Sequence, residues 1–168
     1  MAPTNNGTVS LHCIEERPDN LIDKLVDIWN ASVRATHKFL AESDINEIRE
    51  CLPNMFVNIP HLIVALDEND APIAFMGVED GMLEMLFVSP THFGIGIGRK
   101  LVEYGIDNLA IERVTVNEQN PDAIGFYEHL GFRRYHRTEC DTEGRPFPLI
   151  FMRYNNYINN SDFLVVNP

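Results

Sequence analysis

Three glycines at alternate positions, Gly94, Gly96 and Gly98, have a spacing that suggests binding chemistry. They follow an apolar run over 82–88 and precede an amphipathic run over 101–109. This order predicts a buried strand, a turn and the start of a helix. At a helix start the main-chain N–H groups converge and the helix dipole is positive. Glycines let a ligand approach this backbone closely, so the segment is expected to bind a phosphate.

Three other interpretations of the glycine run compete with this one. It could be only a tight turn that packs a helix onto a sheet. A nucleoside-triphosphate loop, G-x-x-x-x-G-K-[ST], is disfavoured because Arg99-Lys100-Leu101 follows Gly98 and offers no hydroxyl for magnesium. A dinucleotide fingerprint needs G-x-G-x-x-G, whereas this chain has G-x-G-x-G. The dinucleotide interpretation stays open because Glu118 lies about where a ribose-binding acid would fall.

Longer segments carry a resemblance to a known family. The run Phe93-Gly94-Ile95-Gly96-Ile97-Gly98 resembles motif A of the GNAT superfamily of N-acetyltransferases, R/Q-x-x-G-x-G/A, and V-S-P at 88–90 matches the V-x-P before it. The segment 117–132 is similar to motif B, N-x-x-A-x-x-F-Y-x-x-x-G-F. Phe93 stands where the family usually has Arg or Gln. Segments 32–40, 116–120 and 141–149 further resemble a bacterial single-domain group, the YjaB-like acetyltransferases.

The resemblance implies an acetyl-CoA-dependent N-acetyltransferase that moves an acetyl group to a primary amine by direct transfer in a ternary complex, without a metal. The pantetheine arm would pair with the edge of the central strand, and the pyrophosphate would sit on the amides of the glycine loop. The residues that the resemblance assigns to the cofactor are Leu86, Phe87, Val88, Phe93, Gly94, Ile95, Gly96, Ile97, Gly98, Arg99, Asn120, Phe126 and Tyr127.

Acyl transfer to an amine needs a neutral amine and a protonated leaving thiolate. Tyr127 matches the family tyrosine that protonates the thiolate, although it could also be a core aromatic beside Phe126. Glu84 is the one charge in the apolar run over 82–88. A carboxylate there must face a cavity or a hydrogen-bonded partner, so Glu84 is a base candidate unless it merely reaches solvent near Gly81.

Residues near the expected end of the first helix form a second candidate group. In the fold that the resemblance implies, the connection between the first two helices borders the acceptor side. Thr36 and His37 are therefore expected to contact the substrate, together with Asn117, and His37 is a second base candidate. A packing role for His37 beside Phe39 and Leu40 is the alternative.

The order of the expected elements is strand, two helices, three strands, helix, strand, helix and two strands. Alternation and turn residues place strands over 9–15, 61–67, 72–78, 82–88, 113–117, 132–140 and 148–154. Asp19-Asn20 is expected to cap the first helix, and Ser43 or Asp44 the second. The fold class is α/β (α+β), a GNAT-type mixed central sheet of about seven strands with splayed central strands. Dimerisation through the last strands is compatible with this fold.

Length, charge and cysteine content bound the remaining possibilities. The 168 residues, 45% hydrophobic, predict a single domain over 1–168, with a core at about 9–154 and a C-terminal tail at 155–168. Three cysteines far apart in the sequence indicate a reducing compartment, and neither a signal segment nor a membrane span is apparent, so the cytoplasm is the expected location. A net charge of −12 disfavours nucleic acid; it suits a cationic acceptor or simply keeps the protein dissolved.

Two functions from other classes remain at this point. One is a nucleotide-cofactor oxidoreductase, and the other is a non-catalytic acyl-CoA-binding module. The acceptor is left open among small molecules, such as a polyamine, an amino acid or an antibiotic, and a protein lysine or N-terminus.

Overall fold

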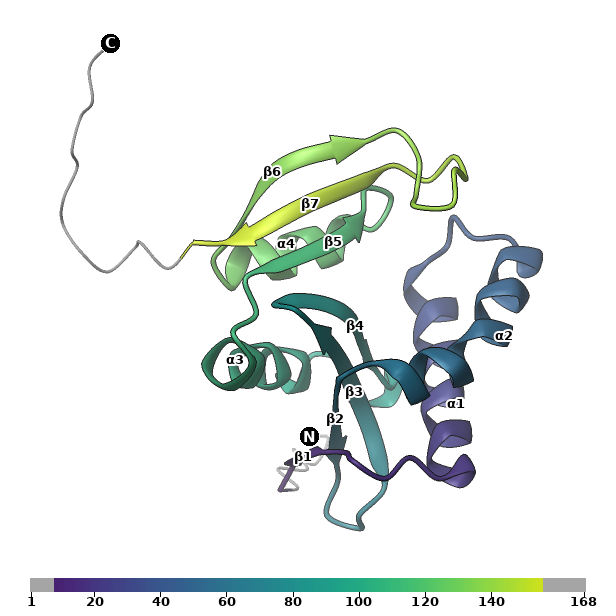
Figure 1. The fold of residues 1–168 in the computed structure, drawn as a ribbon, viewed down its shortest axis with the longest axis vertical. Coiled ribbons are helices and arrows are strands. Elements are labelled where there is room, and N and C mark those ends of the chain that lie inside the picture. The colour runs from purple at the N-terminus through teal and green to yellow at the C-terminus, as the bar shows by residue number, and fades with distance from the viewer. Residues whose placement is uncertain (1–7, 156–168) are drawn as a thin grey trace, which may run out of the picture.

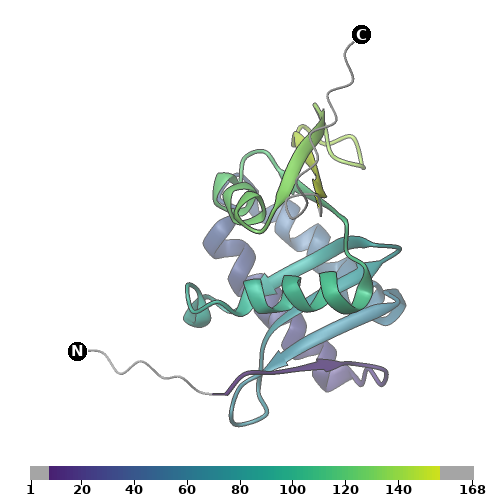
Figure 2. The same ribbon diagram turned by 90° about the vertical axis from the view of Figure 1, so that its left-hand side faces the viewer.

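The computed structural model of the chain describes residues 8–155, and the segment 156–168, most of the expected tail, lies outside that range. Within the described range, seven strands form one sheet, in the order β1-β2-β3-β4-β5-β7-β6, with helices on both of its faces (Figures 1 and 2). The elements are β1 (Ser10–Cys13), α1 (Asp19–Thr36), α2 (Glu42–Asn58), β2 (His61–Leu66), β3 (Pro72–Glu79), β4 (Met82–Val88), the 3-10 helix η1 (Pro90–His92), α3 (Ile97–Leu109), β5 (Arg113–Asn117), α4 (Pro121–His129), β6 (Phe132–Thr138) and β7 (Leu149–Tyr154). This order confirms the predicted fold class.

The sheet consists of two antiparallel parts that meet at β4 and β5. Strands β1 to β4 form a meander, and β7 pairs with both β5 and β6. The parallel pairing of β4 with β5 involves only Met82 with Arg113 and Leu83 with Val114. Beyond Leu83 the two strands separate (Figure 1), so the rest of the β4 edge has no strand partner on that side among residues 8–155.

A bulge interrupts β4 just where the two strands separate. Gly77 of β3 pairs with Met85 and Val78 pairs with Leu83, which leaves Glu84 as an extra residue without a partner. A bulge of this kind breaks the strict alternation of side chains and bends the strand. Glu84 is exposed between the buried Leu83 and Met85 for this reason.

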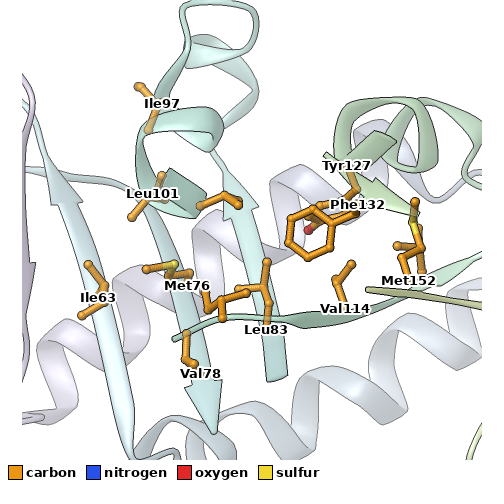
Figure 3. Packing of buried hydrophobic residues seen from close by; sticks show 14 of the residues in the cluster. Ile63, Met76, Val78, Leu83, Ile97, Leu101, Val114, Tyr127, Phe132 and Met152 are labelled. Carbon is orange, nitrogen blue, oxygen red and sulfur yellow. The ribbon is translucent and has the colours of Figure 1, made fainter. Parts of the chain in front are cut away.

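Two apolar cores cover the two faces of the sheet. Figure 3 shows the core on the side of α3 and α4, in which Ile63, Met76, Leu101 and Phe132 pack together. The second core joins α1 and α2 to the other face, and β4 contributes Met85 to it. The helices therefore pack against the sheet through their apolar sides.

Neither of the first two helices begins at the predicted N-cap residue, although Asp44 does cap the start of α2 from within its first turn. The residue before α1 is Pro18, and no side chain caps that end of the helix. Helix α2 begins at Glu42, and Asp44 lies in its first turn, where its Oδ2 accepts a hydrogen bond of 2.8 Å from the amide of Ala41. In the described range, no helix combines the length and apolarity that crossing a bilayer requires.

Candidate active site

A cavity of about 640 Å³ opens between α1, the free edge of β4, the glycine loop and α4. Most of the residues expected to hold the cofactor line it, namely Leu86, Phe87, Val88, Phe93, Gly94, Gly96, Ile97, Gly98, Arg99, Asn120, Phe126 and Tyr127. The exception is Ile95, whose side chain lies outside this lining and is 61% exposed. Thr36 and His37 also line this cavity, which is called the cofactor cavity below.

The glycine loop presents unused hydrogen-bond donors to the cofactor cavity. Gly94 and Gly96 have φ angles of +77° and +86°, which only glycine adopts readily, and a Cβ at either position would meet nothing within 4 Å. The first backbone bond at this end of α3 runs from the amide of Lys100 to the carbonyl of Gly96, at 3.0 Å. The amides from Gly94 to Arg99 have no partner among residues 8–155. This arrangement fits an anionic group such as a pyrophosphate.

Cationic side chains contribute little to this loop. Phe93 is 42% exposed and carries no charge where the family usually has Arg or Gln. Arg99 pairs with Glu103 at 2.7 Å between the guanidinium and the carboxylate. His92 also lines the cavity, and its Nδ1 lies 2.9 Å from the hydroxyl of Thr91. The backbone is therefore the main anion-binding element here.

The free edge of β4 and the start of α4 form the inner part of the cofactor cavity. Leu86 and Val88 lie beyond the last residue that pairs with β5, so that edge can accept an extended, amide-bearing chain. Asn120 is 8% exposed and caps α4, because its Oδ1 accepts a bond of 3.3 Å from the amide of Ala123.

Tyr127 is both a packed aromatic residue and part of the cavity wall. Its ring lies 5.0 Å from that of Phe126 and 5.6 Å from that of Phe132, as Figure 3 illustrates for the second pair. Burial raises the pKa of the Tyr127 phenol above its ordinary value. The phenol stays protonated at neutral pH, and none of the described residues hydrogen-bonds its hydroxyl. Tyr127 can therefore donate a proton into the cavity.

A second cavity of about 310 Å³ adjoins the first and is called the acceptor cavity below. Glu84, Asn117 and His37 line it, so all three predicted side chains reach this space. His37 and Phe87 line both cavities and therefore form the wall between them.

Glu84 reaches the acceptor cavity because of the bulge in β4. Desolvation raises the pKa of its carboxyl, the nearby Glu79 adds to the increase, and Arg113 partly offsets it. No hydrogen bond to the Glu84 carboxylate occurs among the described residues. Glu84 thus lines the cavity and is also exposed to solvent, so both interpretations of this residue describe part of its surroundings, and its role as a base stays a prediction.

His37 lies just after the last residue of α1 and is held on several sides. Its ring centroid is 5.5 Å from that of Phe39 and 6.3 Å from that of Phe87. Its Nδ1 lies 2.8 Å from the hydroxyl oxygen of Thr36. Burial lowers the pKa of the imidazole below its ordinary value, so the ring is neutral at pH 7. A neutral imidazole can accept a proton in this position.

The loop between β6 and β7 supplies residues that the sequence did not assign to the site. Asp141, Arg145 and Phe147 line the acceptor cavity. Asp141 accepts bonds from the amides of Glu143 (2.9 Å) and Arg145 (2.8 Å), and from Nε of Arg145 (2.8 Å). Arg145 also lies 3.8 Å from Glu47 of α2, measured between the charged atoms. The D-x-x-G-R-P sequence marked this loop, but not the cavity that it closes.

The dinucleotide interpretation of the glycine run is wrong. The strands that lead into the loop form an antiparallel meander, whereas a dinucleotide fold requires parallel βαβ units. Glu118 forms two bonds with the guanidinium of Arg137, at 2.7 and 2.8 Å. In the part of the chain that the structure describes, no three His, Cys, Asp or Glu side chains gather where they could hold a metal ion.

Comparisons with known proteins agree with this geometry. Residues 58–134 match the model of an acetyltransferase (GNAT) domain. The peptidyl-lysine N-acetyltransferase YjaB of Escherichia coli K12 is 38% identical over 132 residues, which cover 79% of this chain and 89% of that protein. The solution structure of apo YjaB has a TM-score of 0.78 at 36% identity and matches 88% of this chain and 97% of that one. The PaiA N-acetyltransferase of Thermoplasma acidophilum, solved with coenzyme A, has a TM-score of 0.65 at 18% identity over 88% of this chain and 99% of its own, a likeness of fold.

Proposed function

The chain belongs to the GNAT acetyltransferase family and is an acyltransferase, and we propose that it transfers an acetyl group from acetyl-CoA to the side-chain amine of lysine in a peptide or protein. The observation that carries the proposal is the row of amides from Gly94 to Arg99 without a partner among the described residues, in a cavity that Tyr127 also lines. The lysine acceptor is taken from YjaB, a peptidyl-lysine N-acetyltransferase.

The cofactor cavity fits coenzyme A in three ways. The loop amides would hold the pyrophosphate, the free edge of β4 from Leu86 to Val88 would pair with the pantetheine arm, and Phe126 would pack beside it. When bound, acetyl-CoA supplies an acetyl group that is activated as a thioester. The positive φ angles of Gly94 and Gly96 keep the loop backbone in the shape that this binding requires.

The acetyl group passes directly from acetyl-CoA to the amine while both substrates are bound. Two side chains carry out the proton transfers that accompany this step. His37 Nε2 takes the proton that the attacking amine must lose, and the Tyr127 hydroxyl gives a proton to the leaving sulfur. The N–C bond forms as the C–S bond breaks, and the two proton transfers leave the net charge of the enzyme unchanged. The neutral ring of His37 and the protonated phenol of Tyr127 suit these roles.

The acceptor cavity suits a lysine side chain. Trp29, Phe87 and Phe147 provide apolar walls for its methylene groups, and Asn117 lies beside them. Asp141 and Arg145 form an ion pair and offset each other's charge, so Glu84 leaves the cavity with one net negative charge. A cationic amine is attracted to such a space, and Glu84 helps to bind the amine while His37 acts as the base.

The direct test is thiol release from acetyl-CoA with peptides that contain one lysine, with mass spectrometry to locate the acetyl group. We expect release with a lysine peptide and none when that lysine is replaced by norleucine. An N-terminal acetyl group on both peptides excludes reaction at the α-amine. A protein that binds acetyl-CoA but releases thiol with none of these amines is the non-catalytic module instead.

Ligand-induced stabilisation separates the cofactor assignment from the acceptor assignment. A ligand that binds only the native state raises the melting temperature by mass action. Acetyl-CoA is expected to stabilise the protein, and NAD and ATP are expected not to. Stabilisation by NAD alone would contradict the proposed cofactor.

We also propose that the protein is cytoplasmic and that it can form a homodimer. All three cysteines, Cys13, Cys51 and Cys140, are exposed free thiols, which suits the reducing conditions of the cytoplasm. Strand β6 forms one edge of the sheet, and a homodimer through β6 and β7 would show as a doubled mass in light scattering. Binding of nucleic acid or a membrane is not expected at a net charge of −12.

A further inference from the structure

Ser32, Thr36 and His37 form a short chain of hydrogen bonds at the end of α1. The hydroxyl oxygen of Thr36 lies 2.8 Å from the carbonyl oxygen of Ser32, one helical turn earlier. The same hydroxyl oxygen lies 2.8 Å from Nδ1 of His37. Both distances are those of ordinary hydrogen bonds.

The direction of both bonds follows from the number of hydrogens. A carbonyl oxygen can only accept, so the single hydrogen of the Thr36 hydroxyl points to Ser32. The hydroxyl must then accept in its contact with the imidazole, and the hydrogen of that bond belongs to Nδ1 of His37. A neutral imidazole carries one N–H, so the lone pair is on Nε2.

The surroundings leave Nε2 as the nitrogen that is available to a substrate. Among residues 8–155 the ring makes no hydrogen bond other than the one through Nδ1. Phe39 and Phe87 contact the ring and limit its rotation. The ring also lies in the wall that the cofactor and acceptor cavities share.

We propose that Thr36 is a positioning residue for the acetyl transfer: its hydroxyl, held by the Ser32 carbonyl, fixes His37 in the Nδ1–H tautomer and so keeps Nε2 free to accept the amine proton. This inference rests on the proposed role of His37 as the base. The expectation that Thr36 contacts the substrate stays a prediction beside this one; because the hydrogen of its hydroxyl is used by the backbone, such a contact could only be one in which Thr36 accepts.

A second threonine–histidine pair provides an internal comparison. The Thr91 hydroxyl lies 2.9 Å from Nδ1 of His92, at nearly the same distance as in the first pair. Its other partner is the hydroxyl of Ser89, at 3.0 Å, which can donate or accept. The tautomer of His92 is therefore not fixed by these two contacts, and of the two pairs the one at the end of α1 has a defined direction.

The tautomer can be measured without any activity assay. In protein labelled with ¹⁵N-histidine, long-range ¹H–¹⁵N correlations identify which ring nitrogen carries the proton, and the loss of signals in His37→Gln assigns them. We expect protonation at Nδ1 in the wild type and in Thr36→Ser, and a mixture of tautomers in Thr36→Val, which has nearly the same shape without the hydroxyl. Thr91→Val is the matched control and is expected to leave the His37 signals unchanged.

Kinetics then test whether the tautomer matters. Loss of one orienting hydrogen bond is expected to lower kcat of Thr36→Val about 5- to 10-fold. The KM for acetyl-CoA should stay the same, and Thr36→Ser should restore most of the rate. Thermal unfolding of each variant checks that it is folded.

The outcomes separate this inference from the proposed function. Protonation of wild-type His37 at Nε2, or an unchanged tautomer in Thr36→Val, overturns the inference even if the enzyme acetylates lysine. A changed tautomer with full kcat overturns the positioning role as well. Absence of lysine acetylation by the wild type contradicts the proposed function and leaves the tautomer result standing.

Discussion

The cofactor cavity and the acceptor cavity share a wall but are built in different ways. In the cofactor cavity, two short continuous segments, the glycine loop and the free edge of β4, offer main-chain atoms to the ligand, beside side chains of α1 and α4. The acceptor cavity depends on side chains from α1, α2, the bulge of β4, β5 and the loop before β7. Backbone donors tolerate many side chains, whereas side-chain walls change with each substitution. The cofactor can thus stay the same while the acceptor varies.

Changes at Tyr127 should affect catalysis without affecting cofactor binding. Tyr127→Phe keeps the packing against Phe126 and Phe132 but removes the proton donor. The value of kcat is expected to fall by about 10²- to 10⁴-fold, the usual effect of losing a positioned acid. Calorimetric titration with coenzyme A should give an unchanged Kd. Nearly full turnover would show that the phenol only packs here.

A negative charge in the glycine loop should weaken coenzyme A binding in the cofactor cavity without affecting the acceptor cavity. Gly96→Asp places a carboxylate beside the pyrophosphate site, and like-charge repulsion of several kcal/mol weakens coenzyme A binding by about 10²- to 10³-fold. Gly96→Asn has the same size without the charge. Gly144→Asp carries the same charge at a similar φ, +79°, in the β6–β7 loop.

Both control variants should bind coenzyme A far more tightly than Gly96→Asp. Equal losses in all three would mean that backbone strain, and not the charge, weakens binding. Tight binding by a folded Gly96→Asp would show that the loop is only structural.

Replacing His37, the proposed base in the wall between the two cavities, should lower kcat to an extent that depends on pH. Burial lowers the pKa of His37 below its ordinary value near 6.5, so the ring is neutral at and above that pH. His37→Gln should lower kcat about 10²-fold at neutral pH, and the difference should shrink as alkaline pH deprotonates lysine unaided. A full set of pH–rate profiles checks this. A constant ratio of the two rates at all pH values would argue against a base.

Glu84 should affect acceptor binding more than turnover. Glu84→Gln removes one negative charge from the acceptor cavity, so KM for a lysine peptide should rise by less than about 10-fold, or 1.4 kcal/mol. Glu79→Gln is the matched control, because Glu79 acts on Glu84 only through its charge and does not line the cavity. A loss of kcat comparable to that of His37→Gln would identify Glu84 as the base.

The smallest expected effect concerns stability. The unfolded chain binds a proton at His37 near pH 6.5, whereas the native chain binds it only at lower pH, since its pKa is lowered. Stability from this residue is therefore complete above about pH 6.5 and declines as pH falls toward the folded pKa. As the pH is lowered from 8 to 5, the melting temperature should fall less in His37→Gln than in the wild type. Parallel curves would contradict the lowered pKa.

The parts of the molecule that could be predicted are those encoded in continuous sequence. The order of strands and helices followed from apolar patterning, and the glycine loop was marked by Gly94, Gly96 and Gly98. Two details of these segments differ from the prediction. Ile95 faces solvent instead of the cavity, and α1 starts without a side-chain cap. Both depend on the direction of the chain at a turn, which residue types do not determine.

The acceptor side could be predicted only in part, because distant segments form it. The apolar run over 82–88 marked Glu84 as unusual, but the bulge that exposes it arises from pairing with Gly77 and Val78. The contribution of Asp141 and Phe147 requires the β6–β7 loop to fold back toward α2. The tautomer of His37 depends on a carbonyl one turn earlier, a contact that residue identity alone does not reveal.

The most direct test of two cavities that are filled together is an initial-rate matrix in which acetyl-CoA and a lysine peptide are both varied. Direct transfer in a ternary complex predicts double-reciprocal lines that intersect, because both substrates are bound before any product leaves. Parallel lines, with half-reactions that release coenzyme A in the absence of peptide, would indicate a covalent acetyl-enzyme and contradict the account.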